Sequence, residues 1–482
     1  MDKPPHPSSL KLSAAKRALL EALLRDENLS LDAAQRISPR NRSEPAPLSF
    51  AQEGLWFLHQ LDRTGSTYNV PLTFVLKGRL EVEALEWGLN QVIQRHEILR
   101  TTVGVIAGQA CQVIAPELAV SIRRIDLRFL PESQRQPEML RKAIEEARKP
   151  FDLAHGPLLR VTLIQVEEEK FFLVLCLHHL VFDEWSQEVL FREWSQFHQA
   201  YLTGMPASLP DMPIQYADYV VWQRGRLQHE VHQAQLSYWK EKLASAPKVL
   251  TLPLDHLRTA SLSFRGAFQR RQLPSNLVEG LRRLAQSEGT TLFMAYLAAY
   301  QVLLFETSRQ EDILIGTPMA NRQRPELENL IGYLLNTLVL RANLSGDPDF
   351  RQVLKRVRQT VLEAFEHQDL PFDQLVRELK PQRDPSRHPL FQVAFVLLPA
   401  TLQRLQLSGL EAQSMRLDYG WSKFDLTLFM IESDSGMTAG LEYCVDLFDP
   451  STIERLLDRF LALLEVLLAN PDHPISVITS SS

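Results

Sequence analysis

The sequence predicts an α/β protein built from two lobes, and three observations carry that prediction. From Leu48 onward, short apolar or β-branched runs alternate with segments of helical periodicity, which is the pattern of α/β folds. A proline-rich stretch at 203–213 (TGMPASLPDMP) interrupts this pattern, and a second α/β block follows it. We therefore expect an N-terminal helix and linker at 1–47, one lobe at 48–210 and a second lobe at 211–482.

The segment before the first lobe contains two features. Residues 13–25 (SAAKRALLEALLR) have helical spacing, with Ser13 placed as an N-cap. An isolated helix of this length is marginal in water, so it should dock on this chain or on an upstream protein. Residues 38–47 (SPRNRSEPAP) are proline-rich and charged, which predicts an extended linker.

Within the lobes, periodicity predicts the individual elements. In the first lobe we expect strands at 70–76 and 171–177 and helices at 81–95 and 185–201. The run at 171–177 is continuously apolar, as a buried strand is. In the second lobe we expect helices at 276–286, 290–307, 350–367 and 450–469, and strands at 312–316 and 441–447. Pro450 occupies the first turn of the last helix.

Composition excludes several classes of protein. The 482 residues are 45% hydrophobic and 23% charged, with a net charge of −6 and no basic stripe, so we expect no nucleic-acid partner. No run reaches the ~18 apolar residues of a membrane span, and the N-terminus lacks a signal peptide. The cysteines, at 111, 176 and 444, show neither metal-ligand nor disulfide spacing. We expect a cytoplasmic protein with no membrane contact.

The stretch 173–186 (LVLCLHHLVFDEWS) is the most informative of the chain. A buried strand runs directly into His178 and His179, and Asp183 then opens a helix. Polar groups at the end of a strand lie where crevices form. Consecutive side chains of a strand point to opposite faces, so one histidine should project into a cavity and the other into the protein.

Alternatives exist for each of these residues. Asp183 fits a helix N-cap, and it equally fits the partner of a buried arginine that fixes the loop. His-His-x-x-x-Asp contains zinc-ligand types, but adjacent histidines diverge and no second cluster accompanies them, so we expect no metal. The chain has no G-x-S-x-G elbow, which disfavours a Ser/His/Asp hydrolase.

The stretch H-H-L-V-F-D-E-W-S resembles the H-H-x-x-x-D-G signature of condensation domains of nonribosomal peptide synthetases, in the chloramphenicol-acetyltransferase-like superfamily. The resemblance continues in the family's order along nearly the whole chain. The matching segments are S-F-A-Q-E-G-L-W-F-L at 49–58, R-H-E-I-L-R-T at 95–101, Y-A-D-Y-V-V-W at 216–222, I-G-Y-L-L-N-T at 331–337, H-Q-D-L-P-F at 367–372 and R-D-P-S-R-H-P-L at 383–390.

Two positions depart from the family's pattern. Gly54 stands where the family usually has arginine, and Glu184 replaces the glycine that follows the aspartate. Glutamate is favourable in the first turn of a helix, which makes Glu184 a tolerated substitution. Alternatively, its carboxylate narrows the channel, alters acceptor preference or weakens activity.

The resemblance implies two acetyltransferase-like lobes in a V shape with a tunnel at their interface. Donor and acceptor carrier domains would present substrates tethered to phosphopantetheine, and the chain itself would bind no cofactor. His179 would face the tunnel and accept the proton of the attacking amine, while His178 would be structural. Asp183 would pair with Arg322 of A-N-R-Q-R (320–324), supported by Trp185 and Ser186.

The resemblance leaves other functions open. A non-catalytic module of the same fold would recruit carrier proteins or tailoring enzymes, and an ester-forming acyltransferase would need only an alcohol acceptor. Heterocyclising relatives replace the tandem histidines with aspartates, which this chain does not. If the chain is excised from a larger synthetase, an adenylation domain would be its neighbour.

Overall fold

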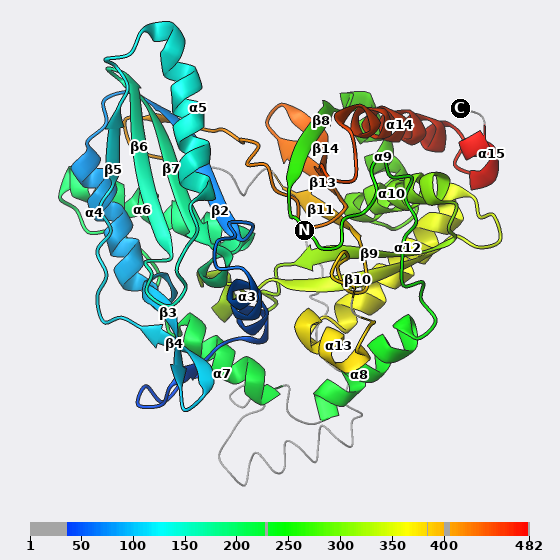
Figure 1. The fold of residues 1–482 in the computed structure, drawn as a ribbon, viewed down its shortest axis with the longest axis horizontal. Coiled ribbons are helices and arrows are strands. Elements are labelled where there is room, and N and C mark those ends of the chain that lie inside the picture. The colour runs from blue at the N-terminus through cyan, green and yellow to red at the C-terminus, as the bar shows by residue number, and fades with distance from the viewer. Residues whose placement is uncertain (1–35, 227–229, 383, 400–404, 481–482) are drawn as a thin grey trace, which may run out of the picture.

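The computed structural model describes residues 36–226, 230–382, 384–399 and 405–480, and it contains three β-sheets with helices packed around them (Figure 1). The helix predicted at 13–25 lies outside the described residues. The segment 38–47, predicted as a linker, is irregular except for a turn and the two-residue strand β1 (Ala46–Pro47).

The first lobe is built on a five-stranded sheet in the order β12-β2-β7-β6-β5. All neighbours in it are antiparallel except β5 and β6. Strands β2 and β7 confirm the strands predicted at 70–76 and 171–177. The strands are β2 (Asn69–Lys77), β5 (Arg123–Asp126), β6 (Leu159–Glu167), β7 (Lys170–His178) and β12 (Glu411–Ser414).

Helices cover both faces of this sheet. Leu173 and Leu175 of β7 pack with α4 (Val82–Arg95) and α6 (Glu184–Thr203), whereas Phe172 and Val174 pack with α5 (Glu132–Arg148). Alternate residues of a strand point to opposite faces, so the continuous apolar run is explained by burial on both sides. Helices α4 and α6 confirm the predictions at 81–95 and 185–201.

Smaller elements complete the first half of the chain. A three-stranded sheet has the order β1-β4-β3. The remaining elements are α3 (Phe50–Leu61), η1 (Glu97–Arg100), β3 (Thr101–Ile106), β4 (Gln109–Ile114), η2 (His179–Val181) and α7 (Tyr216–Arg226).

The second lobe contains a six-stranded sheet in the order β10-β9-β11-β13-β14-β8. Strand β11 is parallel to both of its neighbours, and the other pairs are antiparallel. The strands are β8 (Gly266–Gln272), β9 (Asp312–Met319), β10 (Asn336–Asn343), β11 (Val393–Leu398), β13 (Leu426–Ser433) and β14 (Gly436–Cys444).

The helices predicted at 276–286, 290–307, 350–367 and 450–469 are present in the second lobe, together with further helices that were not predicted. They are α8 (Glu230–Leu243), α9 (Ser275–Ser287), α10 (Leu292–Ser308), α11 (Pro325–Glu328), α12 (Phe350–Glu366), α13 (Phe372–Leu379), α14 (Pro450–Ala469) and α15 (Ile475–Ser480). The strand predicted at 441–447 is partly wrong, because β14 begins at Gly436 and ends at Cys444, where the chain turns.

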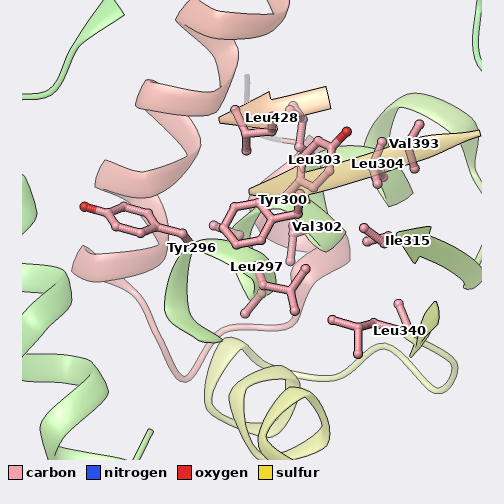
Figure 2. Packing of buried hydrophobic residues seen from close by; sticks show 14 of the residues in the cluster. Tyr296, Leu297, Tyr300, Val302, Leu303, Leu304, Ile315, Leu340, Val393 and Leu428 are labelled. Carbon is pink, nitrogen blue, oxygen red and sulfur yellow. The ribbon is translucent and has the colours of Figure 1, made fainter. Parts of the chain in front are cut away.

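Helix α10 lies at the centre of the second lobe's core. Every residue from Met294 to Leu304 is buried, and a helix that is apolar all round belongs in a core. Its side chains pack against Ile315, Leu340, Val393 and Leu428 of four strands (Figure 2). Helices α9, α12 and α14 contact α10 as well, so the sheet carries a layer of helices.

Segments beyond residue 210 also pack into the first lobe. Strand β12 pairs with β2 at the edge of the first sheet, and Tyr216 and Tyr219 of α7 join the cluster that contains Trp194 of α6. Leu330 and Leu334, which precede β10, belong to the same cluster. The lobe boundary at 210 stays a prediction, and these contacts hold the C-terminal half of the chain against the predicted site.

Candidate active site

The strand β7 delivers the two histidines to different environments. His178 ends the strand and is buried, and its Nδ1 accepts a hydrogen bond from the Leu180 N–H at 3.1 Å. Burial, with further contributions from His59, Lys423 and Arg160, lowers the pKa of His178 to about 3. His178 is therefore neutral at physiological pH, and its ring is hydrogen-bonded to the backbone of the following turn.

His179 begins the 3-10 turn η2 and remains partly exposed. Its backbone N–H donates to the Tyr68 carbonyl at 2.9 Å, and its Nδ1 lies 3.0 Å from the Phe182 carbonyl oxygen. A carbonyl oxygen only accepts, so Nδ1 carries the proton and Nε2 keeps its lone pair. Its ring lies 5.5 Å from that of Tyr333.

Burial keeps His179 neutral. It lowers the pKa of His179 well below the usual value, and the charge of Lys423 lowers it further, whereas the hydrogen bond to Phe182 acts in the opposite direction. The neutral imidazole with a free Nε2 is the form that accepts a proton. The two consecutive histidines therefore hold different tautomers, with Nδ1 as acceptor in His178 and as donor in His179.

Asp183 has both of the structural roles that the sequence left open. It is the N-cap of α6, where its Oδ1 accepts from the Ser186 N–H at 2.9 Å. Both of its oxygens also accept from Arg322, at 2.8 and 3.0 Å, and Oδ2 accepts from the Leu334 N–H at 3.0 Å. The expected ion pair is present, with side chains that are 1% and 2% exposed.

The rest of this network joins α6 to the segment 320–334. Arg322 also donates to the carbonyls of Ala320 and Leu330, each at 3.2 Å. Trp185 donates from Nε1 to the Glu328 carbonyl at 3.0 Å, with the Arg322 guanidinium 5.8 Å from its ring centroid. The network therefore links residues about 140 positions apart along the chain.

Ser186 is enclosed in this network. Its Oγ contacts Asp183 Oδ1 at 2.7 Å and the Gly332 carbonyl at 3.0 Å, and it accepts from the Gly332 N–H at 3.0 Å. Gly332 is required here, because an added Cβ would lie 2.1 Å from Cδ2 of Tyr216. The hydroxyl of Ser186 is buried and fully bonded, so it cannot reach a substrate oxygen without breaking the network.

Glu184 begins α6 and is exposed, unlike Asp183 beside it. The surrounding protein removes water from its carboxyl, and this desolvation raises the pKa of Glu184. The charges of Arg416 and Lys423 act in the opposite direction, and the charge of Asp183 adds to the increase. The side chain of Glu184 is therefore open to solvent but has protein on several sides. The two positive charges that act on it belong to Arg416 and Lys423, both in the segment before β13.

Several residues near His179 were assigned no role from the sequence. Lys423 has its ammonium 5.3 Å from the ring centroid of Tyr68, and burial lowers the pKa of that ammonium while Glu442 and Glu184 oppose the decrease. Tyr333 lies in the segment I-G-Y-L-L-N-T, which the sequence identified without assigning that residue a role. Tyr68 and Lys423 lie outside every segment that the sequence singled out.

Two further findings concern ligands and membranes. Among the described residues, no three His, Cys, Asp or Glu side chains converge in a way that could hold a metal ion. In the same part of the chain, every helix is too short or too polar to cross a bilayer.

The lowered pKa of His178 predicts how the free energy of unfolding depends on pH. The folded pKa of His178 is about 3, below the value of about 6.5 in an unfolded chain. The unfolded state therefore binds the proton first, so stability is complete above pH ~6.5 and falls as the pH decreases toward 3. We expect wild type to lose about 1.4 kcal/mol per pH unit more than His178→Gln in that window.

Urea denaturation at several pH values measures this difference. His155→Gln is the matched control, because the side chain of His155 is 83% exposed. Equal slopes for wild type and His178→Gln would contradict the prediction.

Comparisons with known proteins agree with the motifs. The profile of the condensation domain family matches residues 42–482. The chain is 44% identical over 477 residues to one of the linear gramicidin synthase proteins of Brevibacillus parabrevis, an alignment that covers 98% of this chain and 6% of that protein. The chain thus spans a small part of the length of this relative.

Solved structures share the fold as well. The X-domain from teicoplanin biosynthesis matches with a TM-score of 0.83 and 27% identity, over 92% of this chain and 99% of that one. The four-domain nonribosomal peptide synthetase AB3403, bound to AMP and glycine, matches with a TM-score of 0.80 and 25% identity, over 90% of this chain and 33% of that one. The resemblance seen in the motifs is confirmed: the chain belongs to the condensation domain family.

Proposed function

We propose that this condensation domain is catalytically active and joins two carrier-bound substrates through an amide bond. The observation that carries the proposal is the contact of 3.0 Å between His179 Nδ1 and the Phe182 carbonyl. It leaves the only in-plane lone pair of the neutral ring on Nε2. His179 is then a proton acceptor held in one orientation.

The reaction needs few other groups. An α-amine has an ordinary pKa of about 7.7–8, so a useful fraction is neutral at physiological pH. Its nitrogen attacks the thioester carbonyl carbon, a C–N bond forms, and the carbonyl electron pair moves to oxygen. His179 takes a proton from the positively charged nitrogen. The electron pair on oxygen then re-forms the C=O bond, the C–S bond breaks, and the leaving thiolate takes the proton held by His179, so that the amide remains.

An amine acceptor needs less from a base such as His179 than an alcohol does, because a neutral amine attacks first and loses its proton afterwards. A weakly basic imidazole cannot readily deprotonate an alcohol before attack. It accepts a proton from the ammonium of the tetrahedral intermediate once the C–N bond has formed, and it can return that proton to the leaving thiolate. We therefore favour amide formation over ester formation for this chain.

Partners and substrates follow from the same proposal. The donor and acceptor would arrive on the phosphopantetheine arms of two carrier domains, through a tunnel between the lobes. The tethered arms would align the two reacting groups, which supplies much of the barrier reduction. Similarity to a four-domain nonribosomal peptide synthetase supports an adenylation domain as a neighbour in a longer protein.

A second candidate function is a non-catalytic recruitment module. Two observations favour it, namely the carboxylate of Glu184 beside the site and the similarity to the X-domain, for which a complex with OxyB has been solved. The intact arrangement of His179, Phe182 and Asp183 favours catalysis.

Reconstituted transfer separates the two functions. One carrier is loaded with a panel of acyl and aminoacyl donors and another with an amino-acid acceptor, and intact-protein mass spectrometry follows the acceptor. We expect a mass gain with wild type. Glu184→Gly should keep transfer within about tenfold of wild type. A first-turn glutamate stabilises a helix by under about 1 kcal/mol, so its loss should leave α6 and the site folded. Carrier binding without transfer in both proteins would overturn the catalytic proposal in favour of recruitment.

A further inference from the structure

An aspartate on α13 lies directly against the position where this chain departs from the first family motif. Oδ1 of Asp373 would be 2.4 Å from a Cβ added at Gly54, and Oδ2 would be 3.2 Å from it. Gly54 lies within α3, where glycine is unfavourable by about 1 kcal/mol relative to alanine. The missing side chain at position 54 therefore makes room for the carboxylate of Asp373.

Within the described residues, this carboxylate forms no ion pair, and its hydrogen bond is to its own backbone N–H. Its neighbour Glu53 takes the nearby cations, since Arg377 and Arg224 both pair with Glu53. Burial raises the pKa of Asp373 to about 7, Arg377 acts in the opposite direction, and Glu53 adds to the increase.

Helix α3, against which Asp373 lies, borders the turn that begins at His179, because Gln52 of α3 donates to the Leu180 carbonyl at 2.9 Å. The charge of Asp373 raises the pKa of both Tyr68 and Tyr333, after the larger effect of their burial. Tyr333 has its ring 5.5 Å from that of His179, and the Tyr68 carbonyl accepts the His179 N–H at 2.9 Å. The side chain of Asp373 is partly exposed, so a cation that approaches it can contact the carboxylate.

We propose that Asp373, accommodated by Gly54, is a specificity-determining residue that binds a positively charged side chain of a tethered substrate. The inference rests on the proposed function of the site. A partly desolvated carboxylate without a counter-ion is costly, and an ammonium or guanidinium group from the substrate would supply the missing charge. A neutral side chain of the same length would leave the carboxylate unpaired, and this difference selects the cation.

The cation has two sources, because either the donor or the acceptor can carry the basic side chain. The experiment therefore compares lysyl with norleucyl groups, which have equal chain lengths, first on the acceptor carrier and then on the donor carrier. We expect wild type to prefer lysyl by about tenfold or more in kcat/KM in one of the two arms. The arm that shows the preference identifies the source.

The near-isosteric Asp373→Asn should abolish this preference. We expect its kcat/KM to fall about tenfold or more with lysyl substrates and less than about threefold with norleucyl substrates. Asp62→Asn is the control, because it removes an exposed carboxylate at the end of α3 and should leave the preference unchanged. Equal losses on both substrates, or no loss in either arm, would overturn the proposal.

A binding measurement keeps this inference separate from the proposed function. Lysyl and norleucyl pantetheine amides, which cannot undergo transfer, are titrated calorimetrically into His179→Ala and into the His179→Ala, Asp373→Asn double variant. Preferential lysyl binding that Asp373→Asn abolishes supports the inference even if wild type transfers nothing. If wild type transfers both substrates and prefers lysyl over norleucyl neither in rate nor in binding, the inference is wrong and the proposed function is still supported.

Discussion

Alanine at position 179 is expected to slow amide formation about 10²–10⁴-fold, the usual contribution of a general base. His179 offers Nε2 to the substrate because Nδ1 is 3.0 Å from the Phe182 carbonyl. Alanine removes this proton acceptor and leaves the approach of the substrates open. Single-turnover transfer between loaded carriers, followed by intact-protein mass spectrometry, measures the loss.

Two controls make the result specific to the imidazole. His155→Ala should keep the wild-type rate, because the His155 side chain is 83% exposed and pairs locally with Asp152. The thermal melt of His179→Ala should stay near that of wild type, since its ring is partly exposed. A loss below tenfold in folded His179→Ala protein would refute the central role of this residue.

Asparagine at position 183 should be strongly destabilising. The Asp183–Arg322 pair is almost completely buried, and Asp183 also accepts from the Leu334 N–H and from Ser186. Asp183→Asn leaves the Arg322 guanidinium buried without a counter-charge, which costs about 3–5 kcal/mol of unfolding free energy. Urea denaturation followed by circular dichroism measures this cost.

The matched control is an exposed ion pair of the same lobe. Glu83 and Arg124 form a pair in which both side chains are more than half exposed, so Glu83→Gln should leave the unfolding midpoint almost unchanged. Because the Asp183 pair links α6 to the segment before β10, Asp183→Asn should also slow transfer. An unchanged midpoint for Asp183→Asn would show that the pair does not stabilise this fold.

The local part of the site was readable from the sequence. The apolar run that ends in two histidines predicted β7, and Asp183 predicted the start of α6, which begins at Glu184. The alternation of a strand predicted that His178 and His179 would diverge, and they do. The pairing of Asp183 with Arg322 came from the family resemblance, because nothing local connects residues 139 positions apart.

Other features could not be predicted from local pattern. The strand predicted at 441–447 was misplaced because the apolar run continues past the turn after Cys444. Strand β12 has four residues and no periodicity strong enough to detect. It becomes a strand because the edge of β2 is free to pair with it.

The sequence by itself determined most of the helices and strands and the order of the motifs, because periodicity and short motifs are local properties. The assignment of His179 rather than His178 to the site came from the family resemblance. Only the tertiary structure decided which tautomer His179 holds, since that depends on the Phe182 carbonyl. It also decided that Lys423, Tyr68 and Asp373 share its surroundings. The charges of Lys423 and Asp373 act through space between parts of the chain that are far apart in sequence. The order of residues along the chain does not show which of these charges lie close to His179.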